Sequence, residues 1–272
     1  MKRVVITGMG INSCIGNTLE DVLHSLQNGI SGTRFNQTYA DLNFKSHVSA
    51  AAEQDFDNID RKLKRFMGVC AMYAYNSAVA AVEHAGLKAE DLAGNPRYGI
   101  AGGSGGGSTA SVIEMNELLE TKGARKVGPF FVPRNMTNTI TANVGVAFKL
   151  QGISHTITSA CATSADAIGY AYNQIQLGKQ DLMLAGGGEE DHWSQSLLFD
   201  AMGALCSKYN DTPETASRPY SADRDGFVIA GGGGFVVLES LEHAQARGAN
   251  ILAEVVGYAA NADGADMVAP SG

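Results

Sequence analysis

Residues 156–178 read Thr-Ile-Thr-Ser-Ala-Cys-Ala-Thr-Ser-Ala-Asp-Ala-Ile-Gly-Tyr-Ala-Tyr-Asn-Gln-Ile-Gln-Leu-Gly. A β-rich run, residues 153–158, enters a cluster of small residues around Cys161. Apolar and polar side chains then alternate with the three- and four-residue steps of an amphipathic helix, and Gly178 is placed to end it. The apolar positions are Ala165, Ile168, Tyr172 and Ile175, and the opposite side carries Asp166, Tyr170, Asn173 and Gln174. This pattern predicts a strand-to-helix junction with Cys161 at the start of the helix.

Cys161 has the surroundings of a nucleophile. The N-terminal end of a helix stabilises anions, and the thiolate is the reactive form of cysteine. Small neighbours leave the sulfur room to meet a substrate. The alternative is an ordinary buried cysteine, and a nucleophile also needs a supporting base.

The six histidines do not supply that base in any way the sequence reveals. His155 precedes Cys161 on the same strand, but six residues of strand at ~3.3 Å each separate the two by roughly 20 Å. His192 follows a glycine-rich strand end and is the one histidine expected to face a cleft. No Cys/His pair can be assembled from this pattern.

Composition limits the class of protein. The 272 residues suffice for one large or two modest domains, and a net charge of −8 argues against a broad nucleic-acid-binding surface. The four cysteines form no Cys-x-x-Cys pair, which disfavours a zinc site or a disulfide framework and favours a reduced, cytoplasmic protein. No run approaches the roughly 18 apolar residues of a membrane span. Thr7, Gly8 and Gly10 interrupt the first apolar run, which we interpret as a strand rather than a signal peptide.

Strand patterns alternate with helix patterns along most of the chain. Expected strands cover 3–7, 98–101, 153–158, 181–185, 227–229, 235–238 and 251–258, and expected helices cover 18–26, 63–85, 109–120, 135–148, 163–177, 194–202 and 239–247. Residues 29–58 and 203–222 are expected to be irregular. Glycine clusters should close the strands, and the run at 102–108 should form a turn that approaches a neighbour or a ligand closely. Such alternation is typical of an α/β fold with a largely parallel sheet and layers on both faces.

Two basic stretches stand out in this acidic chain. Arg61, Lys62, Lys64 and Arg65 open one predicted helix, and Lys122, Arg125 and Lys126 lie between two others. Cations at a helix start oppose the helix dipole. Each stretch is either a solvated helix end or a patch for an acidic partner.

Several separated segments together resemble one family. They are Val5-Ile-Thr-Gly-Met-Gly10, Ala101-Gly-Gly-Ser-Gly-Gly-Gly107, Ile157-Thr-Ser-Ala-Cys-Ala-Thr-Ser164, Gln176-Leu-Gly-Lys-Gln-Asp181, Ala185-Gly-Gly-Gly-Glu-Glu190, Phe199-Asp-Ala-Met-Gly-Ala-Leu205, Ala222-Asp-Arg-Asp-Gly-Phe-Val-Ile-Ala-Gly-Gly-Gly-Gly234 and Val256-Gly-Tyr258. Their order and spacing resemble the β-ketoacyl-[acyl-carrier-protein] synthases, the bacterial type I enzymes more than type II. The resemblance covers essentially all 272 residues.

The resemblance implies the thiolase fold, with two similar α/β halves in five layers, and a homodimer. Residues 1–250 would form the N-terminal half and residues 251–272 the beginning of the C-terminal half. Cys161 would take an acyl chain from acyl carrier protein as a thioester, and malonyl-carrier protein would then lose carbon dioxide and attack it. The family uses no metal and no redox cofactor. Partners beyond the carrier protein, such as nucleic acid or membrane, are not implied.

The same resemblance assigns further residues. Phe199, Met202 and Gly105 would line the acyl pocket, and a backbone N–H of Cys161 would help to stabilise the oxyanion. Lys62, Arg65, Lys122 and Arg125 fall where the family docks its acidic carrier protein.

The chain departs from the family in one large respect. The His-Gly-Thr-Ser-Thr and Gly-His segments that carry the two catalytic histidines do not occur in the 272 residues, nor does the later Gly-Phe-Gly-Gly turn. A truncated synthase is therefore expected. A smaller departure is Ser221, where many relatives have Asp. The alternatives are an inactive fragment, a paralogue that only binds carrier protein, and a degradative thiolase acting on coenzyme A esters.

Overall fold

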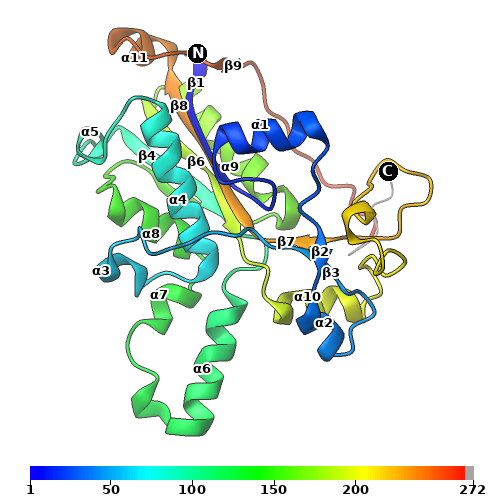
Figure 1. The fold of residues 1–272 in the computed structure, drawn as a ribbon. Helices are drawn as coiled ribbons and strands as arrows, with labels where there is room; N and C mark the ends of the chain where they lie inside the picture. Colours follow the sequence, from blue (N-terminus) through cyan, green and yellow to red (C-terminus); the bar gives the residue numbers. More distant parts are fainter. Residues whose placement is uncertain (267–272) are drawn as a thin grey trace.

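The computed structural model describes residues 1–266 (Figure 1). Its main sheet has the strand order β5 (Ser154–Thr156), β4 (Tyr98–Gly103), β6 (Leu182–Glu189), β8 (Gly232–Ser240), β1 (Val4–Asn12) and β9 (Ala253–Val255). β4 runs parallel to β5 and β6, whereas β6–β8, β8–β1 and β1–β9 are antiparallel. The predicted α/β fold is confirmed, but the prediction of a largely parallel sheet is wrong. The segment between β6 and β8 does not cross back over the sheet, so β8 re-enters from the end at which β6 leaves.

Helices cover both faces of this sheet, as the sequence predicts. On one face α4 (Val69–His84) packs on β1, β6 and β8, and α8 (Thr139–Ala147) packs on β4. On the other face α9 (Thr163–Gln176) lies against β4 and β6. Alternate residues of β6 serve the two faces, with Leu182 and Leu184 in the α4 core and Met183 and Ala185 in the α9 core.

A second sheet is small and lies beside the first. It contains β2 (Arg34–Phe35), β3 (Val48–Ala50) and β7 (Ile229–Ala230), so the stretch expected to be irregular holds short elements, including α2 (Gln37–Asp41). The other helices are α1 (Leu19–Asn28), α3 (Arg61–Lys64), α5 (Ala89–Leu92), α6 (Thr109–Lys122), α7 (Phe131–Asn135), α10 (Trp193–Ala201) and α11 (Leu241–Ala246). Short 3-10 turns are η1 (Ala124–Lys126), η2 (Ala160–Ala162) and η3 (Pro213–Thr215). Within residues 1–266, no helix has both the length and the apolar character needed to cross a membrane.

Local signals for helix ends are accurate in two places. Thr18 caps α1 by accepting the N–H of Asp21, and Gly29 ends it in the left-handed conformation. Gly178 follows α9 with φ of +72°. The face of α9 is less well predicted, because Ala165 is exposed and Gln174 is buried. The helix instead approaches the sheet closely through small residues such as Ala167 and Ala171.

The long helix predicted over residues 63–85 is two helices, α3 and α4. Gly68 separates them in an extended conformation and forms the N-cap of α4. A Cβ atom at Gly68 would lie 1.8 Å from Ser108 Oγ, so the glycine lets the segment before α6 pass against this break. A periodicity pattern does not register such a contact.

Strands also continue through glycines that were expected to end them. β1 passes through Gly8 and Gly10, and β6 passes through residues 186–188. A Cβ atom would lie 2.1 Å from Ala81 O at Gly8 and 2.2 Å from Ser77 O at Gly10. These glycines are therefore in the sheet because the backbone of α4 lies directly on it.

The predicted division at residue 250 remains a prediction. β9 follows it and pairs with β1, so the first residues of the predicted C-terminal half add a strand to the main sheet. The last part of that predicted half, residues 267–272, lies outside the described residues.

A buried carboxylate ties β8 to its neighbours. Glu239 is fully buried and accepts hydrogen bonds from Arg247, His243 and Thr7, with an Arg247 Nη2 to Oε1 distance of 2.6 Å. Burial alone would raise the pKa of Glu239, but these three side chains lower it from 4.5 to about 2. A carboxylate with a depressed pKa stabilises the fold above its unfolded value, and this contribution disappears as the pH falls from about 4.5 towards 2.

We therefore expect Glu239→Gln to lower the free energy of unfolding at pH 7 by about 3 kcal/mol, because it leaves Arg247 without its buried partner. The difference from the unmodified chain should shrink as the pH falls below about 4.5. Urea unfolding at several pH values measures both effects. Glu254→Gln, which removes an exposed partner of Arg3, is the control and should cause a much smaller change. An equal loss in the two variants would contradict the role of the buried network.

A second expectation concerns the contact between α4 and β1. Gly10→Ala should lower the free energy of unfolding by about 3 kcal/mol, because its Cβ atom has no space beside Ser77 O. Gly145→Ala in α8 is the matched control. Its nearest neighbour would be Ile100 Cγ2 at 3.9 Å, so helix propensity should make it neutral or stabilising. Thermal unfolding of the two variants tests this, and a stable Gly10→Ala protein would contradict the close contact.

Candidate active site

Cys161 lies in η2, directly before α9, as the sequence predicts. Cys161 is exposed, whereas Cys70 and Cys206 are buried and Cys14 is half-buried. Ala160, just before it, has φ of +51°, a left-handed conformation that alanine adopts at a cost of about 1–2 kcal/mol. A strained turn thus presents the thiol at the positive end of a helix, and the predicted strand-to-helix junction is confirmed.

Side-chain hydrogen bonds hold this turn in place. Thr163 Oγ1 accepts the N–H of Ser159 at 2.9 Å and donates to Ala160 O at 2.7 Å. Thr158 Oγ1 donates to Ser104 O at 2.9 Å, which joins the turn to the glycine-rich loop after β4.

A cavity of about 610 Å³ opens beside Cys161. Three glycine-rich segments form part of its wall, namely residues 103–106 at the end of β4 and just after it, 187–188 in β6 and 232–234 in β8. Apolar side chains complete it, including Leu198, Phe199 and Phe227. The lining therefore combines backbone polar groups and the thiol with apolar side chains, which suits a substrate with a reactive polar group and an apolar chain.

Glu189 fixes the glycine-rich loop that faces Cys161. Its carboxylate accepts the hydroxyl of Ser104 at 2.6 Å and the N–H of Gly105 at 2.6 Å, and it also accepts the N–H of Gly106. A Cβ atom at Gly105 would lie 3.0 Å from Ala160 O. The predicted turn with close backbone approach is confirmed, although residues 102 and 103 belong to β4.

Glu190, the next residue, links the cavity to α6. It is 1% exposed and accepts the hydroxyl of Thr109 at 2.8 Å and the N–H of Ala110 at 2.7 Å, so its carboxylate caps the first turn of α6. Burial raises the pKa of this carboxyl group, and the two hydrogen bonds oppose the rise.

The structure brings together Cys161, Gly105 and Phe199, which the sequence assigned to one site. It does not bring Met202 to them. Met202 is the residue after the last turn of α10, is 54% exposed and is not part of the cavity lining. Sequence analysis missed Phe227, which lies in the segment already noted for the family resemblance.

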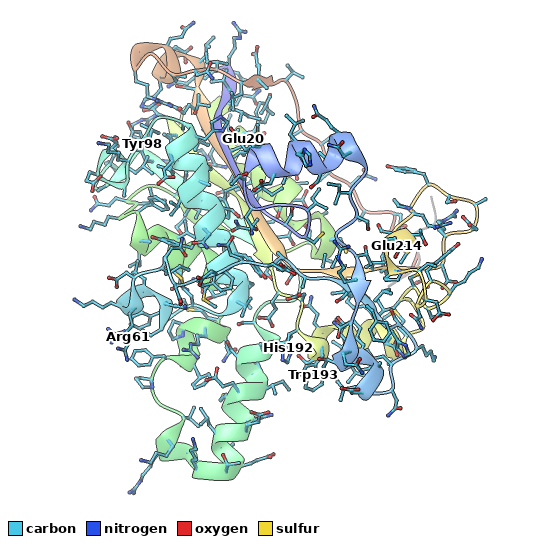
Figure 2. The ribbon with its side chains drawn as sticks, in the orientation of Figure 1. Glu20, Arg61, Tyr98, His192, Trp193 and Glu214 are labelled. Atoms are coloured by element: carbon cyan, nitrogen blue, oxygen red, sulfur yellow. The ribbon has the colours of Figure 1, made fainter. Side chains whose placement is uncertain are left out.

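The basic residues Lys62, Arg65, Lys122 and Arg125 are all exposed. Arg65 lies over the rings of Phe66 and Phe130, 5.0 Å from each centroid, and its carbonyl accepts a hydrogen bond from Arg134 of α7. α7 packs in turn on α6. The two basic stretches therefore lie on one side of the molecule, where α3, α7 and α6 adjoin and α6 projects from the body (Figure 1). Figure 2 shows Arg61 of α3 at the outer edge of this side.

The histidines all have partners away from Cys161 in the part of the chain that the structure describes. His155 is hydrogen-bonded to Tyr170. His192 caps α10 and contacts Ser194 Oγ at 2.7 Å, at the start of the helix (Figure 2). Over residues 1–266, no three His, Cys, Asp or Glu side chains lie close enough together to hold a metal ion.

Comparison with known proteins supplies the family. Residues 1–244 match the model of the beta-ketoacyl synthase N-terminal domain. The chain is 54% identical to 3-oxoacyl-[acyl-carrier-protein] synthase 1 of Escherichia coli over 274 aligned positions, which cover all of this chain and 68% of that protein. A solved beta-ketoacyl synthase from Burkholderia phymatum has a TM-score of 0.91 at 36% identity, over 98% of this chain and 66% of that one. A type II polyketide ketosynthase, solved in complex with its acyl-carrier protein, has a TM-score of 0.79 at 30% identity, over 94% of this chain and 62% of that one.

These neighbours share the thiolase fold that the resemblance implied, and the structure described above corresponds to its N-terminal part. The strained cysteine turn, the glycine-lined cavity and the agreement along the whole chain lead to one conclusion: the chain belongs to the β-ketoacyl synthase family.

Proposed function

We propose that this chain is the nucleophile-bearing part of a 3-oxoacyl-[acyl-carrier-protein] synthase of fatty acid biosynthesis, with Cys161 as the catalytic nucleophile. The observation that carries the proposal is the position of Cys161, exposed on a strained turn at a helix start and open to a cavity with an apolar wall. The Escherichia coli relative that matches the whole chain bears this name.

The first step is transfer of an acyl chain to Cys161. The Cys161 thiolate attacks the thioester carbonyl of acyl-carrier protein, the new carbon–sulfur bond forms, and the thiol of the carrier leaves with the proton that Cys161 gave up. Backbone N–H groups at the start of α9, including that of Cys161, stabilise the oxyanion. The acyl chain then occupies the apolar side of the cavity beside Phe199 and Gly105.

The second step joins two further carbons to the chain. Malonyl-carrier protein loses carbon dioxide, and the resulting carbanion attacks the Cys161 thioester and releases the sulfur. In the family this step uses two histidines in segments that do not occur in these 272 residues. We therefore assign the acyl-transfer half of the reaction to the residues of this chain. In the same proposal residues 251–272 begin the C-terminal half, no metal or redox cofactor takes part, and the protein works as a cytoplasmic homodimer.

Acyl carrier protein is the proposed macromolecular partner. Lys62, Arg65, Lys122 and Arg125 are exposed cations in a chain of net charge −8, so they offer an acidic protein a local attractive surface. Over residues 1–266, Lys62, Lys122 and Arg125 have no ion-pair partner. A related ketosynthase has been solved with its carrier protein bound.

The alternatives receive less support. A paralogue that only binds carrier protein has no need of an exposed cysteine on a strained turn. A degradative thiolase acting on coenzyme A esters has no need of a carrier-protein surface, and the named relatives are synthases. Met202 stays a predicted pocket residue, and it would reach an acyl chain only if the cavity extended along α10.

Cys161→Ala should abolish formation of the acyl adduct, because no other thiol faces the cavity. Intact-mass measurement after incubation with acyl-carrier protein shows whether the mass of one acyl group is gained. Cys14→Ala is the control, since it removes a half-buried thiol outside this cavity and should leave the adduct unchanged. A persistent adduct on Cys161→Ala would refute the assignment.

Reversing the charge of Lys62 and Arg65 to Glu should weaken binding of acyl carrier protein about tenfold at low salt, mainly through slower association. Surface plasmon resonance at two ionic strengths measures the effect, which should diminish as salt screens the charges. The matched control reverses Lys88 and Lys179, two exposed lysines outside the proposed surface. Equal affinities for the two double variants would remove the support for docking at α3.

A further inference from the structure

Tyr258, in the segment that follows β9, lies beside the turn that carries Cys161, residues 159–161. Its hydroxyl donates to Asp166 Oδ1 at 2.7 Å, while the other carboxylate oxygen, Oδ2, accepts the hydroxyl of Ser159. Both oxygens of one carboxylate are thus used, and these two hydrogen bonds lower the pKa of Asp166. Asp166 therefore joins residues 159 and 258, which lie 99 positions apart in the sequence, by a single charged group.

The ring of Tyr258 is seated on the same helix. A Cβ atom at Gly169 would lie 2.1 Å from Tyr258 Cδ2, so only a glycine at that position of α9 admits the ring. One turn of helix separates Gly169 from Asp166. The hydroxyl of Tyr258 is consequently directed to Asp166 by the packing of its own ring.

Ser159 is bound to α9 through both its backbone and its side chain. Its N–H donates to Thr163 Oγ1, and its hydroxyl donates to Asp166. The next residue, Ala160, has the left-handed conformation, and Cys161 follows it. Because alanine adopts this conformation only at an energetic cost, the turn requires fixed neighbours to persist. The hydrogen bonds that Asp166 makes to Ser159 and Tyr258 provide such neighbours.

We propose that Asp166 and Tyr258 are positioning residues that hold the Ser159–Ala160 turn and thereby aim the Cys161 thiol into the cavity. This inference rests on the proposed function, because the orientation of the Cys161 thiol is expected to determine the rate of acyl transfer. It adds that a residue beyond β9 sets the geometry of a nucleophile near the middle of the chain. Neither residue lines the cavity, so neither touches the acyl group.

The test compares acyl transfer to Cys161 in the 272-residue chain and its variants. Asp166→Asn offers an amide in place of one acceptor oxygen, so it should lower the rate at saturating acyl-carrier protein by about tenfold. Tyr258→Phe removes one hydroxyl and should lower it by about threefold. The concentration of carrier protein at half-maximal rate should stay constant, because the proposed docking residues are on other elements. Tyr170→Phe is the matched control. It removes from the same helix a hydroxyl group that is hydrogen-bonded to His155. The rate of acyl transfer should not change.

A rescue separates positioning from general damage. Ala160→Gly removes the cost of the left-handed conformation, since glycine adopts it freely. In the Asp166→Asn background it should restore most of the lost rate. Because Ala160→Gly also relieves strain in the folded state, the rates are measured well below the unfolding temperature of each variant, where a merely less stable variant stays folded and keeps its rate. Unchanged rates in both Asp166→Asn and Tyr258→Phe, or a loss that Ala160→Gly does not recover, would overturn the proposal.

Hydrogen exchange provides a readout that needs no carrier protein. The amides of residues 159–163 should exchange faster in Asp166→Asn and Tyr258→Phe than in the unmodified chain or Tyr170→Phe. Should the unmodified chain take up no acyl group at all, the proposed function fails, and the exchange rates still decide whether the turn is held as described. Equal exchange in all four proteins would refute the positioning role by itself. Ser159→Ala serves as the mildest variant if Asp166→Asn does not fold.

Discussion

The close approach of backbone to backbone at glycines is the constraint on which the structure depends. β4, β6 and β8 lie side by side, and each has a glycine run at the same end of the sheet. A Cβ atom would lie 2.0 Å from Ile157 O at Gly103, 2.5 Å from Ser164 Oγ at Gly187, and 2.4 Å from Cys70 O at Gly188. These contacts bring the cysteine turn to one face of the strand ends and α4 to the other. Gly103, Gly187 and Gly188 themselves also line part of the cavity beside Cys161.

This constraint explains which parts of the fold can be predicted from the sequence. Caps and periodicity depend on neighbours in the chain, so Thr18, Gly29 and the junction at Cys161 are predicted correctly. A glycine has two uses that look identical in sequence: it ends an element, or it admits another backbone. Gly8 and Gly10 serve the second use, and the prediction that they end a strand fails for that reason. The prediction that β8 runs parallel to its neighbours is wrong for a similar reason. The alternation of strands and helices does not reveal which connecting segments cross over the sheet.

The residues of the site likewise fall into those that local sequence predicts and those that only the folded structure reveals. Cys161 is predictable because its chemistry and its local pattern coincide. Phe227 enters the cavity lining from a segment that is held by backbone hydrogen bonds to Ala204 and Cys206, which are distant in the sequence, so no local signal marks it. Met202 shares a short motif with Phe199, yet it follows the last turn of α10 and is not among the residues that line the cavity. Glu190 is similar, since its role as a cap of α6 requires two elements 80 residues apart to meet.

Glu189 and Glu190 also relate the cavity to the basic surface. Glu189 binds the loop that faces Cys161, and Glu190 binds the first turn of α6, which carries Lys122 near its far end. Glu189, the last residue of β6, and Glu190, the residue after it, therefore fix both the loop that faces Cys161 and the base of the projecting helix α6. A carrier protein seated at that helix would lie at a distance set by rigid elements rather than by a flexible linker.

The thiol has to be exposed to meet such a partner, and an exposed thiol cannot be positioned by burial. In this molecule burial raises the pKa of the other three cysteine thiols, those of Cys14, Cys70 and Cys206. Cys161 is held instead by hydrogen bonds to the residues around it, which leave its sulfur free to react.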